Sequence, residues 1–327
     1  MTKFFRSSPI LLILTTLSLA GNVRWEANYH GFLDNREYYN TVQTPKTYIG
    51  SDFMTTAFFQ ITPSHEIAFG LDYLYELGSR FDNHPLKIVT NYRYHREPLY
   101  FQVGVFPRRD LLRYPLALLT DTLDYFRPNI EGFYVNFTGK RISENFWLDW
   151  MNCQSEHARE VFMTGFSGNL TIGQFSLSHY TVINHFALSS PSPADEHIRD
   201  NMAALLKIGW QNRKVGFLDT LQISSGVLMS ADRSRHVSDW YSARGWYSEI
   251  MASRGRFSFA GTFYLGERQK ILFGDRFFGT KSYARTDFIV HAIRIPSVQT
   301  DCSLGLHFIE GKIDFSQTLT VRADFSR

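Results

Sequence analysis

Apolar and polar residues alternate along much of this chain. From His65 to Gly78, large and mostly apolar side chains occupy one parity, and small or acidic residues occupy the other. The segment from Lys312 to Phe325 repeats this period of two, with Gln317 as its one exception. Successive side chains of a strand point to opposite faces, so a period of two predicts β-strands and not helices.

The same criterion, applied along the whole chain, predicts about sixteen strands. Their expected positions are near 23–33, 47–62, 65–78, 86–95, 99–106, 131–138, 145–153, 159–167, 170–183, 201–211, 219–230, 244–252, 256–265, 283–294, 298–308 and 312–325. Counts of about fourteen or eighteen also fit the pattern, because short apolar runs can be divided in more than one way.

The connections between these strands are short and long in alternation. The short ones are expected at 63–64, 96–98, 139–144, 168–169, 212–218, 253–255 and 295–297. The long ones are expected at 34–46, 79–85, 107–130, 184–200, 231–243 and 266–282, while two further connections, 154–158 and 309–311, break the rule. Short turns at one end and long loops at the other are typical of an outer-membrane β-barrel.

Composition favours the same interpretation. Aromatic residues make up 16% of the chain, yet charged residues make up 20% and the mean hydropathy is −0.22. A soluble sandwich or propeller is the alternative, and it would need a solvated face rich in Lys, Glu and Thr. The polar face here is instead rich in Gly, Ala, Ser and charges of both signs, as expected for the lumen of a barrel.

The first twenty residues are predicted to be a secretory signal peptide. Lys3 and Arg6 precede an apolar run from Pro9 to Leu19, and small residues precede a cleavage site after Ala20. The apolar run is too short to span a bilayer. Without the two cations, 32 basic residues face 31 acidic ones, so the charge gives no case for nucleic-acid binding.

The chain therefore resembles Gram-negative outer-membrane porins and porin-like proteins over residues 21–327. The resemblance rests on the signal peptide, the strand count, the alternation of turns and loops, and the last strand, and not on a short motif. It implies an all-β, transmembrane, antiparallel up-and-down barrel in the bacterial outer membrane. One departure is that Ser326 and Arg327 follow Phe325, since such chains usually end on an aromatic residue.

On this barrel model, residue parity assigns charged side chains to the lumen. The predicted lumen residues are Asp52, Glu66, Asp72, Glu76, Lys87, Arg93, His95, Arg285, Asp287, His291, Asp301, His307, Asp314 and Arg322. They could simply neutralise one another across strands, or they could create a field that selects solutes. A barrel of about sixteen strands is wide enough for an aqueous channel.

The longest connection, 107–130, is too interrupted by Arg113 and Pro115 to be a membrane helix. Pro115 to Tyr125 is predicted to form a short helix, with Leu and Phe side chains along one stripe. In sixteen-stranded porins the third outer loop folds inward, and this loop resembles it in position and length. The resemblance implies a constriction lined by Arg108, Arg109, Asp110, Asp121, Asp124 and Arg127. The alternative is a flap that packs on the rim.

Catalytic arrangements are weak in the sequence. A deacylase or phospholipase needs Ser and His in proximity, and the adjacent pairs are Ser178–His179 and Ser64–His65, whose members point to opposite faces of a strand. The acids Asp34, Asp82, Asp121 and Asp124 lie in outer loops, where solvation or divalent-ion binding is the usual role of such groups. The histidines have no metal-ligand spacing. We therefore expect no catalytic residues, metal or cofactor, and a protein that is not an enzyme.

The favoured function is a porin-like channel for small hydrophilic solutes. The alternative is a structural or partner-binding subunit of an outer-membrane complex, and an outer-membrane enzyme is third. Expected partners are outer-membrane lipid and lipopolysaccharide, and either further copies of the chain or other outer-membrane proteins. The aromatic residues of the outer loops (Tyr38, Tyr39, Trp240, Tyr241, Phe277 and Phe278) are interpreted as an interfacial girdle.

Overall fold

The computed structural model describes residues 23–41, 43–80 and 84–327. The predicted signal peptide and Asp82 lie outside the described residues. Sixteen strands form one closed sheet, with a short helix and a short 3-10 helix between them. The elements are β1 (Val23–Glu37), β2 (Lys46–Thr62), β3 (His65–Glu76), β4 (Lys87–Arg96), β5 (Leu99–Pro107), α2 (Asp121–Phe126), β6 (Asn129–Thr138), β7 (Ile142–Asn152), β8 (Val161–Ile172), β9 (Phe175–Phe186), β10 (Arg199–Val215), β11 (Leu218–Ser234), β12 (Tyr241–Arg254), β13 (Phe257–Gly266), η2 (Arg276–Gly279), β14 (Ser282–Ile295), β15 (Val298–Ile309) and β16 (Lys312–Ser326).

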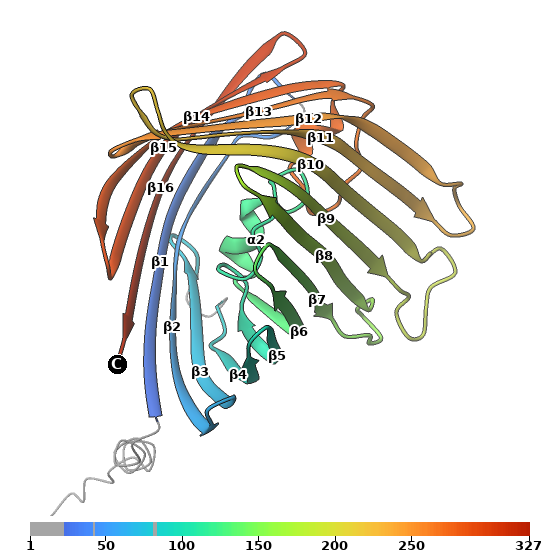
Figure 1. Ribbon diagram of the computed structural model, residues 1–327. Helices are drawn as coiled ribbons and strands as arrows, with labels where there is room; N and C mark the ends of the chain where they lie inside the picture. Colours follow the sequence, from blue (N-terminus) through green and yellow to red (C-terminus); the bar gives the residue numbers. More distant parts are fainter. Residues whose placement is uncertain (1–22, 42, 81–83) are drawn as a thin grey trace, which may run out of the picture.

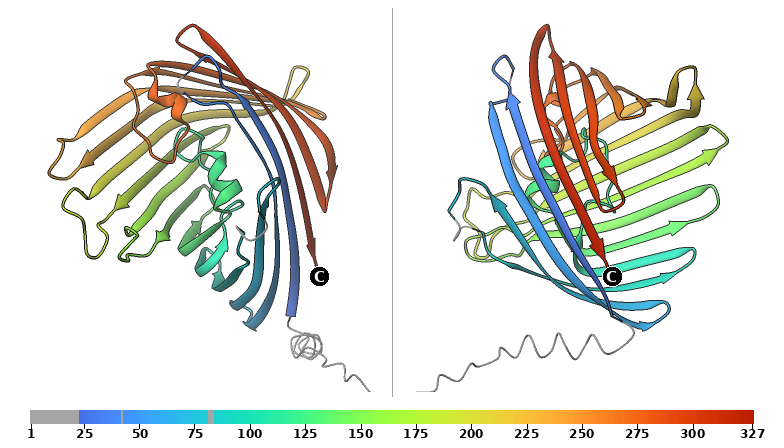
Figure 2. Two further views of the ribbon diagram at one scale, coloured as in Figure 1. Left: turned by 180° about the vertical axis from the view of Figure 1, so that it is seen from behind. Right: turned by 90° about the vertical axis from the view of Figure 1, so that its left-hand side faces the viewer.

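Every strand pairs antiparallel with its sequence neighbours, and β1 closes the barrel against β16. The closing register runs from Glu26 opposite Ser326 to Glu37 opposite Phe315. The ends of the two strands lie side by side in both turned views (Figure 2), and the backbones of Trp25 and Arg327 exchange two hydrogen bonds of 2.9 Å. The prediction of a sixteen-stranded antiparallel barrel is confirmed. Within the described part of the chain, no helix is long and apolar enough to cross a membrane.

The two ends of the barrel differ as predicted. One end carries the tight turns, and the other carries the long loops 108–120, 187–198 and 267–281. In outer-membrane barrels the turns face the periplasm and the loops face outward, so we call these the periplasmic and the extracellular end. The turn between β8 and β9 was predicted at Gly168, but it lies at Gly173, whose φ of +63° suits the left-handed region.

The outside of the barrel is apolar. Large hydrophobic side chains are exposed on the outward parity of most strands, among them Phe53, Phe69, Ile88, Phe166 and Leu206, which are between 45% and 68% exposed. Such a surface is stable only against lipid, because a soluble protein would expose it to water. The protein is therefore a barrel of the bacterial outer membrane.

Two loops occupy much of the extracellular half of the lumen. The loop 108–128, which includes α2, lies inside the barrel wall (Figure 1), and its side chains pack with those of the loop 267–281 against inward-facing side chains of the strands. The buried cluster includes Leu112, Leu118, Leu119 and Leu123 from the first loop, Phe277 and Phe278 from the second, and Trp147, Met163, Val182, Leu205, Leu228 and Tyr247 from the wall. We call the two loops together the plug.

The predicted helix from Pro115 to Tyr125 is mostly absent. Only Asp121–Phe126 is helical. The N–H groups of Leu118 and Leu119 donate to the carbonyl of Pro115, which closes one turn, and then the N–H of Thr120 donates to the carbonyl of Phe273 in the second loop. That contact takes the backbone out of the helix, so tertiary hydrogen bonding overrides the local preference.

The interpretation of the loop aromatics as a girdle was wrong for three of them. Tyr38, Phe277 and Phe278 are at most 5% exposed. The Phe277 ring lies 5.0 Å from that of Tyr38 and 5.2 Å from that of Tyr283, between ring centroids. These rings pack inside the barrel because the second loop folds inward, which a position in an outer loop does not reveal. Tyr39 and Trp240, in contrast, are exposed.

Candidate functional site

The arginines predicted to line a constriction hold the plug in the wall. The guanidinium of Arg108 is 1% exposed and pairs with Asp149 on β7, which is fully buried. Arg109 pairs with Asp52 on β2 and donates to the carbonyl of Asp124 at 2.7 Å. A buried ion pair that loses one partner leaves an uncompensated charge, so Arg108 fixes the loop in place and does not face an aqueous path.

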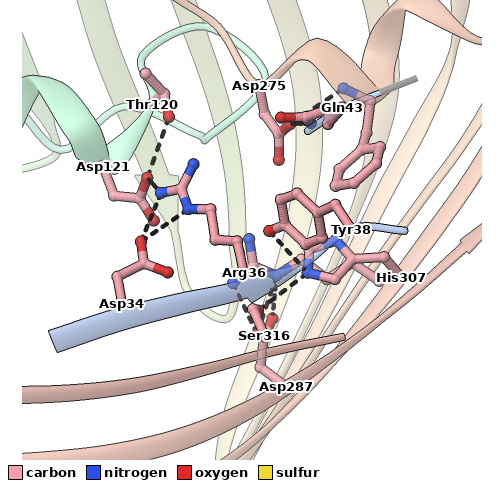
Figure 3. A network of polar contacts seen from close by, with 12 residues as sticks. Asp34, Arg36, Tyr38, Gln43, Thr120, Asp121, Asp275, Asp287, His307 and Ser316 are labelled. Carbon is pink, nitrogen blue, oxygen red and sulfur yellow. Dashed lines mark hydrogen bonds and ion pairs between the residues drawn. The ribbon is translucent and has the colours of Figure 1, made fainter. Parts of the chain in front are cut away.

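Asp121 belongs to a network at the start of α2. Arg36 on β1 donates to Asp121 at 2.7 Å and to Asp34 at 2.6 Å, and the hydroxyl of Thr120 donates to Asp121 at 3.1 Å (Figure 3). The guanidinium of Arg36 therefore joins Asp34 on the barrel wall to Asp121 in the loop 108–128. Nearby, the amide of Gln43 donates to Asp275 of the second loop at 2.9 Å.

The remaining predicted loop residues lie on either side of this plug. Asp110 is exposed and lines a cavity on the periplasmic side, whereas Arg127 lines a cavity on the extracellular side. Burial raises the pKa of the Asp124 carboxyl, and the charge of Asp121 adds to this, while the charges of Arg109, Arg108 and Arg322 oppose it. Burial also raises the pKa of Asp275. The plug thus contains acids that prefer their neutral form more than free carboxylates do.

The predicted lumen residues form several separate clusters. Glu66 lies between Arg24 and Arg93, at 3.5 and 3.8 Å. Asp72 accepts from Asn129 at 2.5 Å, and Arg285 pairs with Asp287 at 2.8 Å. His95 and Arg322 line cavities on the periplasmic side, and Glu76 lines a cavity on the extracellular side. Lys87 lies opposite Asp72 in the β3–β4 register. His307 shares hydrogen bonds with Tyr38, Tyr283 and Ser316, and Asp314 accepts a hydrogen bond from Asn40.

Cavities remain in the lumen on both sides of the plug. The extracellular one measures about 580 Å³ and is lined by Arg36, Lys46 and Arg127, among others. On the periplasmic side, one cavity of about 310 Å³ is lined by residues that include His30 and Arg109, and another of about 540 Å³ is lined by residues that include Lys207 and Ser224. The plug lies between the extracellular cavity and the one beside His30, because α2 contributes residues to the first and the start of the same loop, Arg109 to Leu111, contributes residues to the second.

The last two lumen predictions, His291 and Asp301, meet in an arrangement that the sequence analysis missed. Nδ1 of His291 lies 2.6 Å from Oδ1 of Asp301, and Nε2 of His291 lies 2.9 Å from Oγ of Ser258. The three residues come from β14, β15 and β13, near the periplasmic end. The side chain of His291 is buried and only 9% exposed, whereas the side chain of Asp301 is 39% exposed.

These distances are those of a nucleophile, a base and an orienting acid. A serine is activated when a histidine lies within about 2.6–3.2 Å of its oxygen and a third group fixes the other ring nitrogen. The order Ser–His–Asp is recognised by geometry and not by sequence position. We call Ser258, His291 and Asp301 the lumen triad.

A β-bulge beside His291 sets the geometry. From the turn inward, Ile295 faces Val298 and Ile293 faces Thr300, so regular counting would place His291 opposite Cys302. The register shifts between His291 and Ile293, and His291 therefore faces Asp301. Bulges of this kind re-aim side chains and occur often next to active sites. The only sequence signal was that Ser258, His291 and Asp301 share the lumen parity on three consecutive strands.

The adjacent pairs considered from the sequence do not form such a site. The Ser178 hydroxyl donates to Asn169 at 2.8 Å, and His179 contacts Glu144 at 2.9 Å on the outward face. His65 contacts the Tyr92 hydroxyl instead of Ser64. Among the described residues, no three His, Cys, Asp or Glu side chains gather in a way that could hold a metal ion.

A family model described as Lipid A 3'-O-deacylase-type matches residues 15–320. The chain belongs to this family. The prediction that the protein is not an enzyme is therefore wrong, since the family of the lipid A 3'-O-deacylase type is named for an enzymatic activity. The sequence analysis considered only serine–histidine pairs that are adjacent in the chain, so it did not include side chains that meet across strands, such as Ser258 and His291. No curated protein matches the chain.

Solved structures with the same barrel fold include three bacterial outer-membrane proteins. OpdK from Pseudomonas aeruginosa has a TM-score of 0.56 and 11% identity, over 94% of this chain and 99% of that one. OprD from the same organism has a TM-score of 0.56 and 8% identity, over 94% of each chain. An anion-selective porin from Comamonas acidovorans has a TM-score of 0.56 and 8% identity, over 93% of this chain and 98% of that one. These similarities establish the fold.

Proposed function

We propose that this protein hydrolyses acyl esters, with Ser258 as the nucleophile, His291 as the base and Asp301 as the group that orients His291. The observation that carries the proposal is the pair of contacts on one imidazole, 2.9 Å to Ser258 and 2.6 Å to Asp301. Membership of the lipid A 3'-O-deacylase-type family supports the same class of reaction. Lipid A is therefore the first substrate to test.

The chemistry proceeds in two halves. Nε2 of His291 takes the proton of Ser258 as Oγ attacks the ester carbonyl, and Asp301 accepts a hydrogen bond from Nδ1 and stabilises the imidazolium. The alcohol leaves with the proton that His291 returns, and the acyl group stays on Ser258. Water, deprotonated by the same nitrogen, then releases the carboxylic acid and restores the serine. In each half of the reaction, His291 takes up one proton and then returns it, so the enzyme ends in its starting protonation state.

The location of the triad bears on the choice of ester. Ser258 is the second residue of β13, next to the periplasmic turn, and it faces the lumen. An acyl ester would therefore reach it from the periplasmic mouth of the barrel. Glycerophospholipids are the acyl esters of the periplasmic leaflet, so they form the second substrate arm of the test.

The experiment uses the full mature chain in detergent micelles, with lipid A and a dipalmitoyl phospholipid as separate substrates. Released fatty acid and the mass of the remaining lipid are measured by mass spectrometry. A fluorophosphonate probe, which reacts with activated serines, should label Ser258 in the same preparation. Ser258→Ala should abolish both signals.

Ser303→Ala is the matched control. Ser303 has the same lumen parity on β15, two residues from Asp301, and its hydroxyl contacts Thr318 and not a histidine. That variant should keep full activity and labelling. Equal hydrolysis by the wild type and by Ser258→Ala would refute the proposal, and so would labelling that persists in Ser258→Ala.

A second function, passage of small hydrophilic solutes, is favoured by cavities on both sides of the plug. The extracellular cavity measures about 580 Å³, and the periplasmic cavity beside His30 measures about 310 Å³. Both are lined by cations, including Arg36 and Arg127 above and Arg109 below. Conductance in a planar bilayer tests this directly: deletion of 112–126 should raise it severalfold. An unchanged conductance would exclude the loop as a constriction.

A further inference from the structure

Basic side chains gather at the periplasmic end of the barrel, on its outer face and in its tight turns. They lie in or beside the turns that follow β4, β6, β10 and β12, and they are Arg96, Lys140, Arg141, Lys214, Arg254 and Arg256. Arg96 and Arg254 have the outward parity of their strands, and the other four lie in a turn or within two residues of one. We call these six residues the periplasmic arc, because their turns lie along ten consecutive strands of the closed sheet, β4 to β13.

The charges of the periplasmic arc are not neutralised within the protein. All six residues are exposed, and none has a carboxylate within ion-pair distance among the described residues. At the extracellular end, in contrast, Arg159, Arg199 and Arg268 each have a carboxylate partner, at 3.2, 3.0 and 3.9 Å. The arc therefore presents cations whose partners must come from outside the chain.

Two members of the arc contact the protein in other ways. The guanidinium of Arg254 lies 5.5 Å from the ring centre of Phe217, on the neighbouring turn. Arg256 donates to the carbonyl of Ala292 at 3.5 Å. These contacts limit where the two side chains can point, but neither a ring nor a carbonyl cancels a full charge.

Acids are fewer on this part of the barrel. Glu97, Glu144 and Asp219 lie in the same turns or close to them on the outer face. Asp219 accepts a hydrogen bond from the N–H of Gly255 at 2.6 Å, and Glu144 contacts His179 at 2.9 Å. With six cations against three acids, the periplasmic outer rim of β4–β13 has a net positive charge.

Each turn of the arc also carries a large apolar side chain that is exposed. Arg96 faces Leu99 in the β4–β5 register, and Arg254 faces Phe257 in the β12–β13 register. The exposed fractions of these side chains are 39% for Leu99, 40% for Ile142, 71% for Phe217 and 64% for Phe257. They continue the apolar outer surface, so the cations lie where that surface ends, at the level of the lipid headgroups of the periplasmic leaflet.

We propose that the periplasmic arc binds the headgroups of anionic phospholipids in the periplasmic leaflet, so that these lipids surround β4–β13 in preference to zwitterionic ones. A guanidinium can bond two phosphate oxygens at once, and a lysine adds a point charge. The ammonium group of a zwitterionic headgroup is repelled by the same cations, whereas an anionic headgroup carries no such group. Basic residues close to a membrane surface attract anionic lipid in this way.

The placement of the cations favours lipid over a soluble acidic partner. Because the turns are short, each cation stays next to an exposed apolar side chain that a soluble partner would leave in lipid. An arc along ten strands follows the edge of a bilayer, whereas a docked protein covers a compact patch. The inference rests on the orientation of the barrel and not on the proposed hydrolysis, since the lumen triad lies on the other side of the wall.

The test uses the full mature chain in mixed micelles with two lipids that have the same ether-linked chains, phosphatidylglycerol and phosphatidylethanolamine. An ether cannot be cleaved as an ester, so the result does not depend on the proposed hydrolysis. Native mass spectrometry counts the lipid molecules that stay bound. The wild type should retain phosphatidylglycerol about tenfold better than phosphatidylethanolamine, and Arg96→Gln/Arg141→Gln/Arg254→Gln should reduce this preference to about twofold or less.

Arg244→Gln/Lys281→Gln/Lys312→Gln is the matched control. Its three side chains are exposed at the extracellular end and, in the described part of the chain, have no carboxylate partner. The control loses the same charge and should keep the wild-type preference. Heat-modifiable migration in gels verifies that each variant is a folded barrel.

Three results would overturn the proposal: equal retention of the two lipids by the wild type, an unchanged preference in the arc variant, or an equal loss of preference in the control. The last would mean that net charge, and not the arc, selects the lipid. Displacement of phosphatidylglycerol by free glycerol phosphate at equimolar concentration would overturn the assignment to a lipid.

Discussion

Two histidine–aspartate pairs in this barrel have the same local geometry and different surroundings. His291 and Asp301 face each other across β14 and β15, and His185 and Asp200 face each other across β9 and β10, with Nδ1 to carboxylate distances of 2.6 and 2.9 Å. In the lumen, the free side of the imidazole meets the hydroxyl of Ser258.

On the lipid face, the same pair has other neighbours. The imidazole of His185 lies 5.0 Å from the ring of Phe162, and Asp200 is shared with two arginines. A histidine oriented by an acid becomes a base only if its second nitrogen faces a nucleophile. The third partner therefore sets what each pair can do: a serine makes the imidazole available as a base, as we propose for His291, whereas two arginines place His185 and Asp200 in a cationic cluster.

The largest expected effect separates the two histidines. His291→Gln should reduce fluorophosphonate labelling of Ser258 by a factor on the order of 10³ or more, because the serine loses its base. His185→Gln should leave labelling unchanged. The rate of labelling, followed by in-gel fluorescence, is the measurement. Comparable losses in the two variants would mean that the effect comes from the barrel as a whole and not from the triad.

The two aspartates should differ somewhat less. Asp301→Asn should lower the labelling rate by roughly 10²–10⁴, since the imidazole loses the acceptor that fixes its tautomer. Asp200→Asn should not alter it. If Asp301→Asn retains the wild-type rate, the acid is a structural neighbour and not part of the triad.

Removing the β-bulge beside His291 should have a smaller effect on activity. The His291–Asp301 pair has this bulge, and the His185–Asp200 pair has none. The β9–β10 register runs without interruption, whereas the β14–β15 register shifts beside Ala292. Deleting Ala292 keeps His291 opposite Asp301 but flattens the strand, and displacements of about 1 Å can cost up to about 10²-fold in rate. We expect a loss of about tenfold, with the barrel still heat-modifiable. Full activity would show that the bulge has no role in aiming His291.

The smallest effect concerns a third pair, His179 and Glu144, which lies on the outward face and has neither a serine nor an arginine as a hydrogen-bond or ion-pair partner among the described residues. The Glu144 carboxylate lies over Gly168, where an added Cβ would come within 2.1 Å of it. Glu144→Gln should change the free energy of unfolding by no more than about 1 kcal/mol, measured by urea titration in micelles. It should not alter labelling, and a change in labelling would assign this pair a role.

Alternation along the chain was sufficient to predict the barrel. About sixteen strands and a closing last strand were predicted from the period of two, and short turns at one end from the lengths of the connections, because a closed sheet with lipid outside requires one apolar parity on every strand. The lumen assignment of His291 and Asp301 also follows from parity. The turn at Gly168 was misplaced because glycine both permits turns and leaves room for a neighbouring side chain, here that of Glu144.

The tertiary structure alone decided which partners those lumen residues contact. The second loop enters the barrel because Phe277 and Phe278 find an apolar pocket formed by other strands. Arg108 anchors the plug because Asp149 lies behind it. Ser258 meets His291 only through pairing of β13 with β14, and His291 meets Asp301 only through a one-residue shift in the ladder. Parity determines which face a side chain occupies, but contacts across strands depend on register, and register depends on the whole sheet.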